Sequence, residues 1–562
     1  MFEYQRLKKD ISNALELSIK DKFQIVQKVE LEIPPEGMGD FAFPMFDLLK
    51  SLKKSPEEVG NILMDSLKFP YVKAMKLSGP YLNFYIDFLP LSDDFIKEIW
   101  EKGEDALKFP YKNKKIVLEH TSANPTGPLH VGRGRNPIIG DTLRRLLKKY
   151  GYDVETHYFV NDAGRQSAIL VYGVENLKMD TDEKKLDHAL VSFYQKANEL
   201  LEKDPEVAKK IEQIMMQVES GDEERIRKNR EILGQVLDGI KETLELLKVE
   251  FDLFYWETDL ILNGNVKNVI EMLKEELKEE NGAYYIEVEK DDKKDKVFLI
   301  RKDGTSLYFT RDIAYHLWKS EKGDMIINVL GEDHKPHAEL LENVLRKLKD
   351  DIKIKNVFYS FVSLPEGRMS TRKGRVVYLD DLLDESKEKA REEILKRREN
   401  IVGRSLDKLS QKIGYGAVRY NILKIQSEKQ LVFKWSDALN FEGDSSPFLQ
   451  YAYARASSIL KKQSWSGMFK SSLIKEKPEF SLIKHFLNYP EIIEYSAEQL
   501  KPYRIAKYAF DLASSFNIFY TECPVLKEEE EVMENRLALV HTFKIIMGDL
   551  LDIMGIDHPE EI

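Results

Sequence analysis

The chain has 562 residues, of which 42% are hydrophobic and 33% charged, so it is long enough for several domains, each with a core. Its single cysteine, Cys523, excludes an internal disulfide and a cysteine-based metal cluster, and it suits a reducing cytoplasm. The net charge of −11 argues against a general nucleic-acid coat protein, but local basic patches could still bind a specific RNA. Because the sequence lacks an 18-residue apolar run and an apolar N-terminal signal core, we expect a cytoplasmic chain that neither spans a membrane nor is secreted.

Residues 1–110 are predicted to form a separate α/β unit. Helical spacing occurs over 13–29 and 55–67, and residues 81–88 alternate like a strand. Ser55 is the expected N-cap of the second helix, with proline at the first helical position. Nothing in this unit suggests catalysis, so a small accessory domain is the simplest interpretation. A basic, proline-containing link at 108–115 marks its end.

The segment around which the chain is organised is 120–136, HTSANPTGPLHVGRGRN. It lies between an apolar run at 116–119 and helical spacing over 138–150, and a second strand is expected at 154–160. A turn between a strand and a helix presents backbone N–H groups and the positive helix end to phosphate. Strand, helix and strand together predict a parallel crossover unit with ligands at the carboxyl ends of its strands.

The side chains of this segment suit a phosphate ligand. His130 can donate a hydrogen bond to a phosphate oxygen, and Arg133 and Arg135 add permanent charge. Three glycines would let a ligand approach the backbone: Gly127, Gly132 and Gly134.

After the second strand, Asn161 and Asp162 fall at a carboxyl end. Asp162 could serve the ligand site or could be the N-cap of the next helix, and both interpretations stay open. The charged, helically spaced stretch of about 184–250 predicts an inserted helical hairpin on the core sheet, followed by strands near 283–289 and 296–301.

Carboxylates and histidines then cluster in two places. A short strand is expected at 306–309 and a helix at 312–319, where Asp312 either complements the helix dipole or points into a pocket to hold a cation. Glu257 lies in an aromatic run. A strand at 325–330 precedes GEDHKPH, whose histidine spacing fits no standard zinc pattern, so we expect no protein-bound metal there.

A basic loop follows a buried strand at 357–362. It is either a solvated loop or a mobile clamp that stabilises the charge of a polyphosphate leaving group. Its cations and hydroxyls are Arg368, Ser370, Thr371, Arg372, Lys373 and Arg375. From 405 onward the pattern is helical, and the neighbouring aromatics Phe448 and Tyr451 belong either to the core or to a surface that stacks on RNA bases.

HVGR at 130–133 resembles the HIGH signature of class I aminoacyl-tRNA synthetases, and MSTRKG at 369–374 resembles their KMSKS loop. The runs ANPTGPLHVG, VNDAG, DGTSLYFTRD and FEGDSSPFLQYAYAR most resemble arginyl-tRNA synthetases, and the resemblance spans most of the chain. It implies a multidomain α/β fold. A Rossmann-like parallel-sheet catalytic domain with the helical insertion would occupy 111–403. The unit at 1–110 would contact the outer corner of tRNA, and an all-helical domain at 404–562 would bind the anticodon.

The resemblance also implies roles for individual residues. The reaction would involve His130, Gly132, Arg133, Ser370, Arg372 and Lys373. ATP would contact Thr126, Gly127, His130, Gly132, Gly331, Met369 and Lys373. The arginine pocket would comprise Glu119, Ser122, Asn124, Glu257, Tyr308, Asp312 and His334. Contacts to tRNA would come from Phe448, Tyr451 and Arg455.

The implied reaction is the ATP-dependent activation of L-arginine and its transfer to the 3′ end of tRNA(Arg), by a monomer. Magnesium would accompany the ATP phosphates, no tightly bound cofactor is expected, and activation would require bound tRNA. Two departures from the family pattern bear on this. Arg133 stands at the second histidine of HIGH. Arg368 and Thr371 stand at the two lysines of KMSKS, so either Lys373 or Arg372 takes the place of the second lysine.

Three alternatives were weighed against this function. A class I synthetase for cysteine would need zinc-binding cysteines, and one for glutamate would need cations where this chain has Glu257 and Asp312. A non-catalytic tRNA-binding paralogue stays open because of Arg133 and Arg368. A small-molecule nucleotidyltransferase would not need the long helical C-terminal part.

Overall fold

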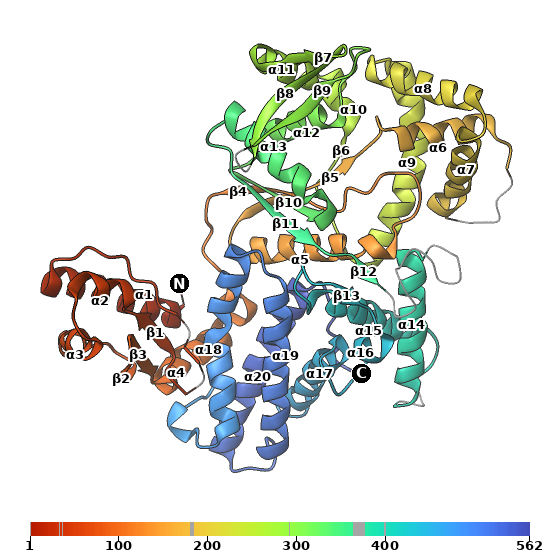
Figure 1. Ribbon diagram of the computed structural model, residues 1–562. Helices are drawn as coiled ribbons and strands as arrows, with labels where there is room; N and C mark the ends of the chain where they lie inside the picture. Colours follow the sequence, from red (N-terminus) through yellow and green to blue (C-terminus); the bar gives the residue numbers. More distant parts are fainter. Residues whose placement is uncertain are drawn as a thin grey trace.

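A computed structural model describes residues 2–32, 34–35, 37–179, 185–290, 293–363, 377–397 and 401–562. Figure 1 shows a small N-terminal unit, a central parallel sheet with helices on both sides, and a bundle of long helices toward the C-terminus. This arrangement confirms the predicted multidomain α/β fold with a helical C-terminal part. In the part of the chain that the structure describes, no helix has the length and apolar character needed to cross a bilayer.

The N-terminal unit is an antiparallel sheet in the order β1-β3-β2, covered by helices. Ser55 is the N-cap of α3, the helix predicted at 55–67, and the Ser55 Oγ accepts a hydrogen bond from the Glu58 N–H at 3.2 Å. The unit packs beside α18 (Lys477–Glu498), where Lys8 pairs with Glu491 at 2.5 Å. Its elements are α1 (Glu3–Phe23), β1 (Phe41–Pro44), α2 (Phe46–Leu52), α3 (Pro56–Ser66), β2 (Val72–Ser78), β3 (Tyr81–Ile86), α4 (Phe88–Lys102) and η1 (Gly103–Leu107).

The central sheet is parallel, in the order β11-β10-β4-β5-β6. The predicted crossover unit is present, because β4 and β5 pair in parallel and α5 connects them along the chain. Figure 1 shows α5 between the sheet and the C-terminal helices, with α12 and α13 on the opposite side. The elements of this sheet and its covering helices are β4 (Lys115–Glu119), η2 (Val131–Arg133), α5 (Arg135–Lys149), β5 (Asp153–Val160), α6 (Arg165–Asn176), β6 (Leu253–Trp256), α10 (Glu257–Leu262), α12 (Tyr308–Ser320), β10 (Met325–Gly331), η4 (Glu332–His334), α13 (Lys335–Leu348), β11 (Ile354–Tyr359), β12 (Val362–Ser363) and α14 (Leu379–Leu395).

Two insertions extend this unit. In place of the predicted hairpin, the described part of the first insertion contains three helices, α7 (Leu186–Leu201), α8 (Pro205–Glu219) and α9 (Glu223–Leu246). The extra break has a local cause, since Asp204 caps α8 and is followed by proline at the first helical position. The second insertion is a small antiparallel sheet with flanking helices: α11 (Asn265–Met272), η3 (Lys274–Glu276), β7 (Lys278–Glu280), β8 (Ala283–Lys290) and β9 (Lys293–Ile300).

One strand prediction is wrong. Residues 306–309 do not form a strand, because α12 already begins at Tyr308 with Leu307 as its extended N-cap residue. Only Ser306 makes a single bridge to Ile300. The early start of α12 puts Tyr308 and Asp312 four residues apart on one helix face.

The C-terminal part is helical, apart from a short strand that pairs with β12. Its elements are α15 (Gly403–Leu423), β13 (Leu431–Val432), α16 (Trp435–Ala438), α17 (Ser446–Lys462), η5 (Ser471–Leu473), α18 (Lys477–Glu498), α19 (Tyr503–Glu522) and α20 (Glu530–Ile553).

Buried histidines predict that the fold weakens in acid. Burial lowers the pKa of His120 and of His316 to about 3. The same rings in an unfolded chain take up a proton near pH 6.5, so between pH 6.5 and 3 the unfolded state binds more protons than the folded state. The free energy of unfolding therefore decreases as the pH is lowered through this range. At pH 5 each of the two histidines should lower the free energy of unfolding by about 2 kcal/mol. Thermal unfolding midpoints measured at pH 7 and pH 5 test this, and a midpoint that is equal or higher at pH 5 would contradict it.

Candidate active site

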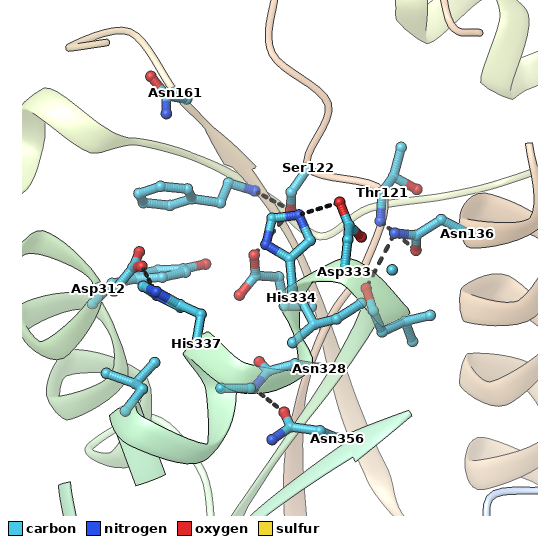
Figure 2. Close-up of a pocket in the computed structure, with 18 of the residues that line it drawn as sticks. Thr121, Ser122, Asn136, Asn161, Asp312, Asn328, Asp333, His334, His337 and Asn356 are labelled. Atoms are coloured by element: carbon cyan, nitrogen blue, oxygen red, sulfur yellow. Dashed lines mark hydrogen bonds and ion pairs between the residues drawn. The ribbon is translucent and has the colours of Figure 1, made fainter. Parts of the chain in front are cut away.

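A cavity of about 530 Å³ lies at the carboxyl ends of the parallel strands. Glu119 ends β4 and Gly331 ends β10, while Glu257 directly follows β6, and all three line the cavity. Open α/β sheets bind ligands at this edge. Figure 2 shows that side chains of α12 and α13 also face it. The predicted site residues that line the cavity are Glu119, Ser122, Asn124, Arg133, Glu257, Tyr308, Asp312, Gly331 and His334. Those that lie outside its lining are Thr126, Gly127, His130 and Gly132.

The turn after β4 fixes the tautomer of His130. Its Nδ1 accepts a hydrogen bond from the Gly132 N–H at 3.1 Å, which caps η2. Burial and then the charge of Arg133 lower the pKa of His130, so the ring is neutral near pH 7 and carries its proton on Nε2. His130 is therefore a neutral ring at the start of the helical segment, and its Nε2–H can donate to a phosphate oxygen.

Arg135 does not serve a phosphate, which corrects the expectation drawn from its sequence position. Its side chain is fully buried and donates to the backbone carbonyls of Ser360, Ile425, Gln426 and Lys429 at 2.7–3.3 Å. Burial lowers its pKa to about 10. Arg135 thus ties the first turn of α5 to the segments beside β12 and β13.

Two of the glycines approach protein rather than an open ligand site. A Cβ at Gly127 would lie 2.7 Å from the Val191 side chain, and one at Gly134 would lie 3.1 Å from Leu379. Their missing side chains therefore allow close packing of the turn against α7 and α14.

The predicted loop residues Met369, Ser370, Arg372 and Lys373 lie outside the described residues, as do Arg368, Thr371 and Arg375. The segment that follows the loop is fixed to the turn of His130 by backbone hydrogen bonds. Val131 N–H donates to the Val377 carbonyl at 3.1 Å, and Leu379 N–H donates to the Leu129 carbonyl at 2.8 Å. Residues 377–379, which follow the loop in the sequence, are thus held at the turn that contains His130.

Glu119 is held by a buried lysine that sequence reasoning missed. The Lys319 ammonium, fully buried on α12, donates to Glu119 Oε2 at 2.6 Å and to Asn328 Oδ1 at 2.8 Å. Its third neighbour is His316 Nε2 at 3.2 Å. The other oxygen of Glu119 accepts a hydrogen bond from Ser122 at 3.0 Å. Three acceptors around the ammonium satisfy its three N–H groups and fix the carboxylate at the cavity wall.

Glu257 is also paired inside the protein. Its Oε1 accepts from Arg311 Nε at 2.5 Å, and Arg311 also donates to the Ser306 carbonyl. Burial raises the pKa of Glu257, and the Arg311 guanidinium opposes this shift. Oε2 of Glu257 is buried without a hydrogen-bond partner, although the residue lines the cavity. Such an oxygen is costly to leave unpaired and suits a donor from a ligand.

Asp312 faces a histidine across the cavity wall. His337 Nε2 lies 2.7 Å from Asp312 Oδ2, and the Tyr308 ring stacks on the imidazole with 5.4 Å between centroids. Asp312 and His337 both line the cavity, and Figure 2 shows the pair. That Asp312 holds a cation there stays a prediction.

Two other candidate residues have structural partners. Asp162 does not line the cavity, and it is not the N-cap of α6. Its Oδ1 instead accepts a hydrogen bond from the Thr258 N–H at 2.9 Å, at the start of α10. His334 points into the cavity, 3.7 Å from Asp333 (Figure 2).

Among the described residues, Asp187, His188 and Asp380 come close enough to share a metal ion. Lys185 Nζ already lies 2.5 Å from Asp380 and 3.1 Å from Asp187, so an ammonium group fills that place.

The predicted RNA-contacting residues gather on α17. Phe448, Tyr451 and Arg455 line a second cavity of about 580 Å³. The Arg455 guanidinium lies over the Tyr451 ring at 4.8 Å and over the Tyr520 ring at 4.5 Å. Tyr451 is exposed, whereas Phe448 is partly buried against Phe510. An exposed tyrosine beside a guanidinium is a surface on which a base can stack.

Comparisons with known proteins agree with this geometry. Residues 96–435 match the family described as "tRNA synthetases class I (R), catalytic domain". The chain is 43% identical to the arginine--tRNA ligase of Methanocaldococcus jannaschii, over 98% of this chain and 99% of the relative, and 41% identical to that of Methanocella arvoryzae over the full length of both. The arginyl-tRNA synthetase structure from Thermus thermophilus is similar with a TM-score of 0.84, 26% identity and coverage of 99% and 100%.

The chain belongs to the arginyl-tRNA synthetase family. Its other two regions match family domains as well. Residues 5–86 match the arginyl-tRNA synthetase N-terminal domain, and 449–562 match the DALR anticodon-binding domain. The predicted boundaries at 110 and 403 stay predictions.

Within this arginyl-tRNA synthetase chain, the residues that sequence reasoning missed are the partners of the pocket carboxylates: Lys319, Arg311 and His337. Lys319 had a usable signal, because it lies two turns after Asp312 on the same helix face. Arg311 had none, since its partner lies 54 residues away on another helix.

Proposed function

We propose that the chain charges tRNA(Arg) with L-arginine in two steps. The arginine carboxylate attacks the α-phosphorus of ATP, and pyrophosphate leaves as arginyl-adenylate forms. The terminal ribose hydroxyl of the tRNA then attacks the acyl carbon, and AMP leaves. No protein nucleophile takes part, so the rate comes from positioning and from charge stabilisation.

The observation that carries this proposal is the set of carboxylates in one cavity. Arginine has two cationic ends, and Glu119, Glu257 and Asp312 line the same space. The carboxyl group of arginine must face ATP at the turn that contains His130, here called the signature turn. The α-ammonium of arginine is therefore expected at Glu119, which ends the strand leading into that turn. The guanidinium then reaches Asp312 and Glu257 with its planar fork. The side-chain carboxylate of a glutamate substrate would be repelled by Asp312 and Glu257.

ATP would lie along the signature turn. His130 would donate from Nε2 to a phosphate oxygen, and Arg133, which is exposed at the cavity, would add charge. The loop cations Arg372 and Lys373, with Ser370, would stabilise the pyrophosphate as it leaves. Magnesium would travel with the ATP phosphates, and its charge would lower the energy of the forming pyrophosphate. The roles of these residues, the monomeric state and a cytoplasmic location stay predictions.

Aminoacylation of total tRNA with each of the twenty amino acids, ATP and magnesium tests the function. Charging with arginine alone is expected. Binding of tRNA without charging would point instead to a non-catalytic paralogue, with Arg133 and Arg368 as the cause. Pyrophosphate exchange with and without tRNA tests the further expectation that activation requires tRNA, which full exchange without tRNA would contradict.

Substitutions on α17 should affect tRNA rather than arginine. Tyr451→Ala should raise the KM for tRNA by an amount corresponding to about 1–3 kcal/mol if its ring stacks on a base, with the KM for arginine unchanged. Phe448→Ala should weaken tRNA use as well, but it should also lower stability because Phe448 is partly buried. Tyr284→Ala, at an exposed tyrosine of β8, is the control. An unchanged KM for tRNA in Tyr451→Ala would exclude stacking.

A further inference from the structure

The His337 imidazole is held in a defined place beside Asp312. Its Nε2 lies 2.7 Å from Asp312 Oδ2. Tyr308 stacks on one face, with 25° between the planes, and Phe309 meets the ring edge-on at 5.0 Å. These contacts come from the first two turns of α12, whereas His337 belongs to α13. The ring therefore links the two helices that face the cavity.

This link leaves Asp312 with one oxygen for a ligand. Among the described residues, the hydrogen bond of its carboxylate is made through Oδ2. Glu257 is in a similar state, because Arg311 takes Oε1 while Oε2 is buried and unpaired. Each carboxylate thus has one oxygen held by a protein group and a second oxygen for which no hydrogen bond is seen among the described residues, and both residues line the same cavity.

We propose that His337 is a positioning residue for arginine recognition in this chain. By holding Oδ2 it directs Oδ1 of Asp312 to the ligand, so that the guanidinium is bound between one oxygen of Asp312 and Oε2 of Glu257. A guanidinium has N–H groups on separate nitrogens in a rigid plane and can bridge two carboxylates, whereas a lysine ammonium is a compact point charge. This proposal rests on the proposed function.

Two variants of the full-length chain separate the hydrogen bond from mere packing. His337→Gln keeps an N–H donor at the position of Nε2, and His337→Leu removes the donor while keeping bulk. In aminoacylation at saturating ATP and tRNA, His337→Leu should raise the KM for arginine roughly tenfold, because a hydrogen bond to a charged group is lost. The KM for ATP should not change. His337→Gln should restore most of the arginine KM.

The control is Lys347→Leu, an exposed position on the same helix whose side chain pairs with Glu276 away from the cavity. It should match the wild type in every parameter. The proposal is overturned if His337→Gln is as impaired as His337→Leu, or if the KM for ATP rises with that for arginine. In those cases a wild type that still charges arginine leaves the proposed function intact. A wild type that charges no arginine overturns both.

Discussion

Asp312→Asn should raise the KM for arginine about a hundredfold and lower kcat, with the KM for ATP and tRNA little changed. Asparagine keeps the shape and an oxygen that can accept from His337 at the same place. It removes the negative charge that faces the guanidinium, and loss of one partner of a hydrogen-bonded charge pair costs about 2–5 kcal/mol. Because Asp312 is only partly buried, the unfolding midpoint should stay close to that of the wild type. Steady-state aminoacylation with varied arginine measures the effect.

Asp333→Asn is the matched control for Asp312→Asn. Asp333 is another carboxylate of the same cavity, but half of its side chain is exposed, and His334 is 3.7 Å away. Asp333→Asn should raise the KM for arginine far less than Asp312→Asn does. Equal effects of the two substitutions would show that overall negative charge, rather than Asp312, selects arginine. An effect of Asp312→Asn on the KM for tRNA alone would contradict the assignment of the pocket.

The parts of the site that could be predicted from the sequence are local ones. The strand, Gly/Pro-rich turn and helix around His130 follow one another within about 35 residues, and their spacing signals act over a few positions. Glu119 and Glu257 lie at the carboxyl ends of strands of the parallel sheet, so their convergence follows from parallel topology. Asp312 lies on α12 and lines the same cavity, but its position does not follow from a strand end.

What the sequence could not give is the pairing of side chains across the fold. Arg135 shares a motif with Arg133, yet the helix turns it inward, where it meets carbonyls up to 294 positions away. A local pattern contains no information on those partners. The strand prediction at 306–309 failed for a related reason, since a run as short as Ser-Leu-Tyr-Phe fits a strand as well as the start of a helix.

The Glu119–Lys319 pair should show the largest stability effects. Lys319→Met leaves the Glu119 carboxylate with Ser122 as its remaining partner, and Glu119→Gln leaves a fully buried ammonium without the carboxylate that neutralises its charge. Breaking a buried pair by removing one partner typically costs about 3–5 kcal/mol. The double variant loses both charges together, so its loss should be smaller than the sum of the two single losses. The free energy of unfolding is measured from the first transition in chemical denaturation, for the wild type, the two single variants and the double variant.

Lys322→Met, at an exposed lysine just beyond the end of α12, serves as the control and should unfold like the wild type. Strictly additive losses of unfolding free energy would mean that Glu119 and Lys319 stabilise the fold independently. That result would contradict an energetic role for the 2.6 Å contact between them. The cycle also separates stability from chemistry. If the double variant recovers the unfolding free energy but not the activation of arginine, then the ion pair is needed because it places a negative charge where the α-ammonium binds. Recovery of both would mean that Glu119 acts only as the partner of a buried lysine.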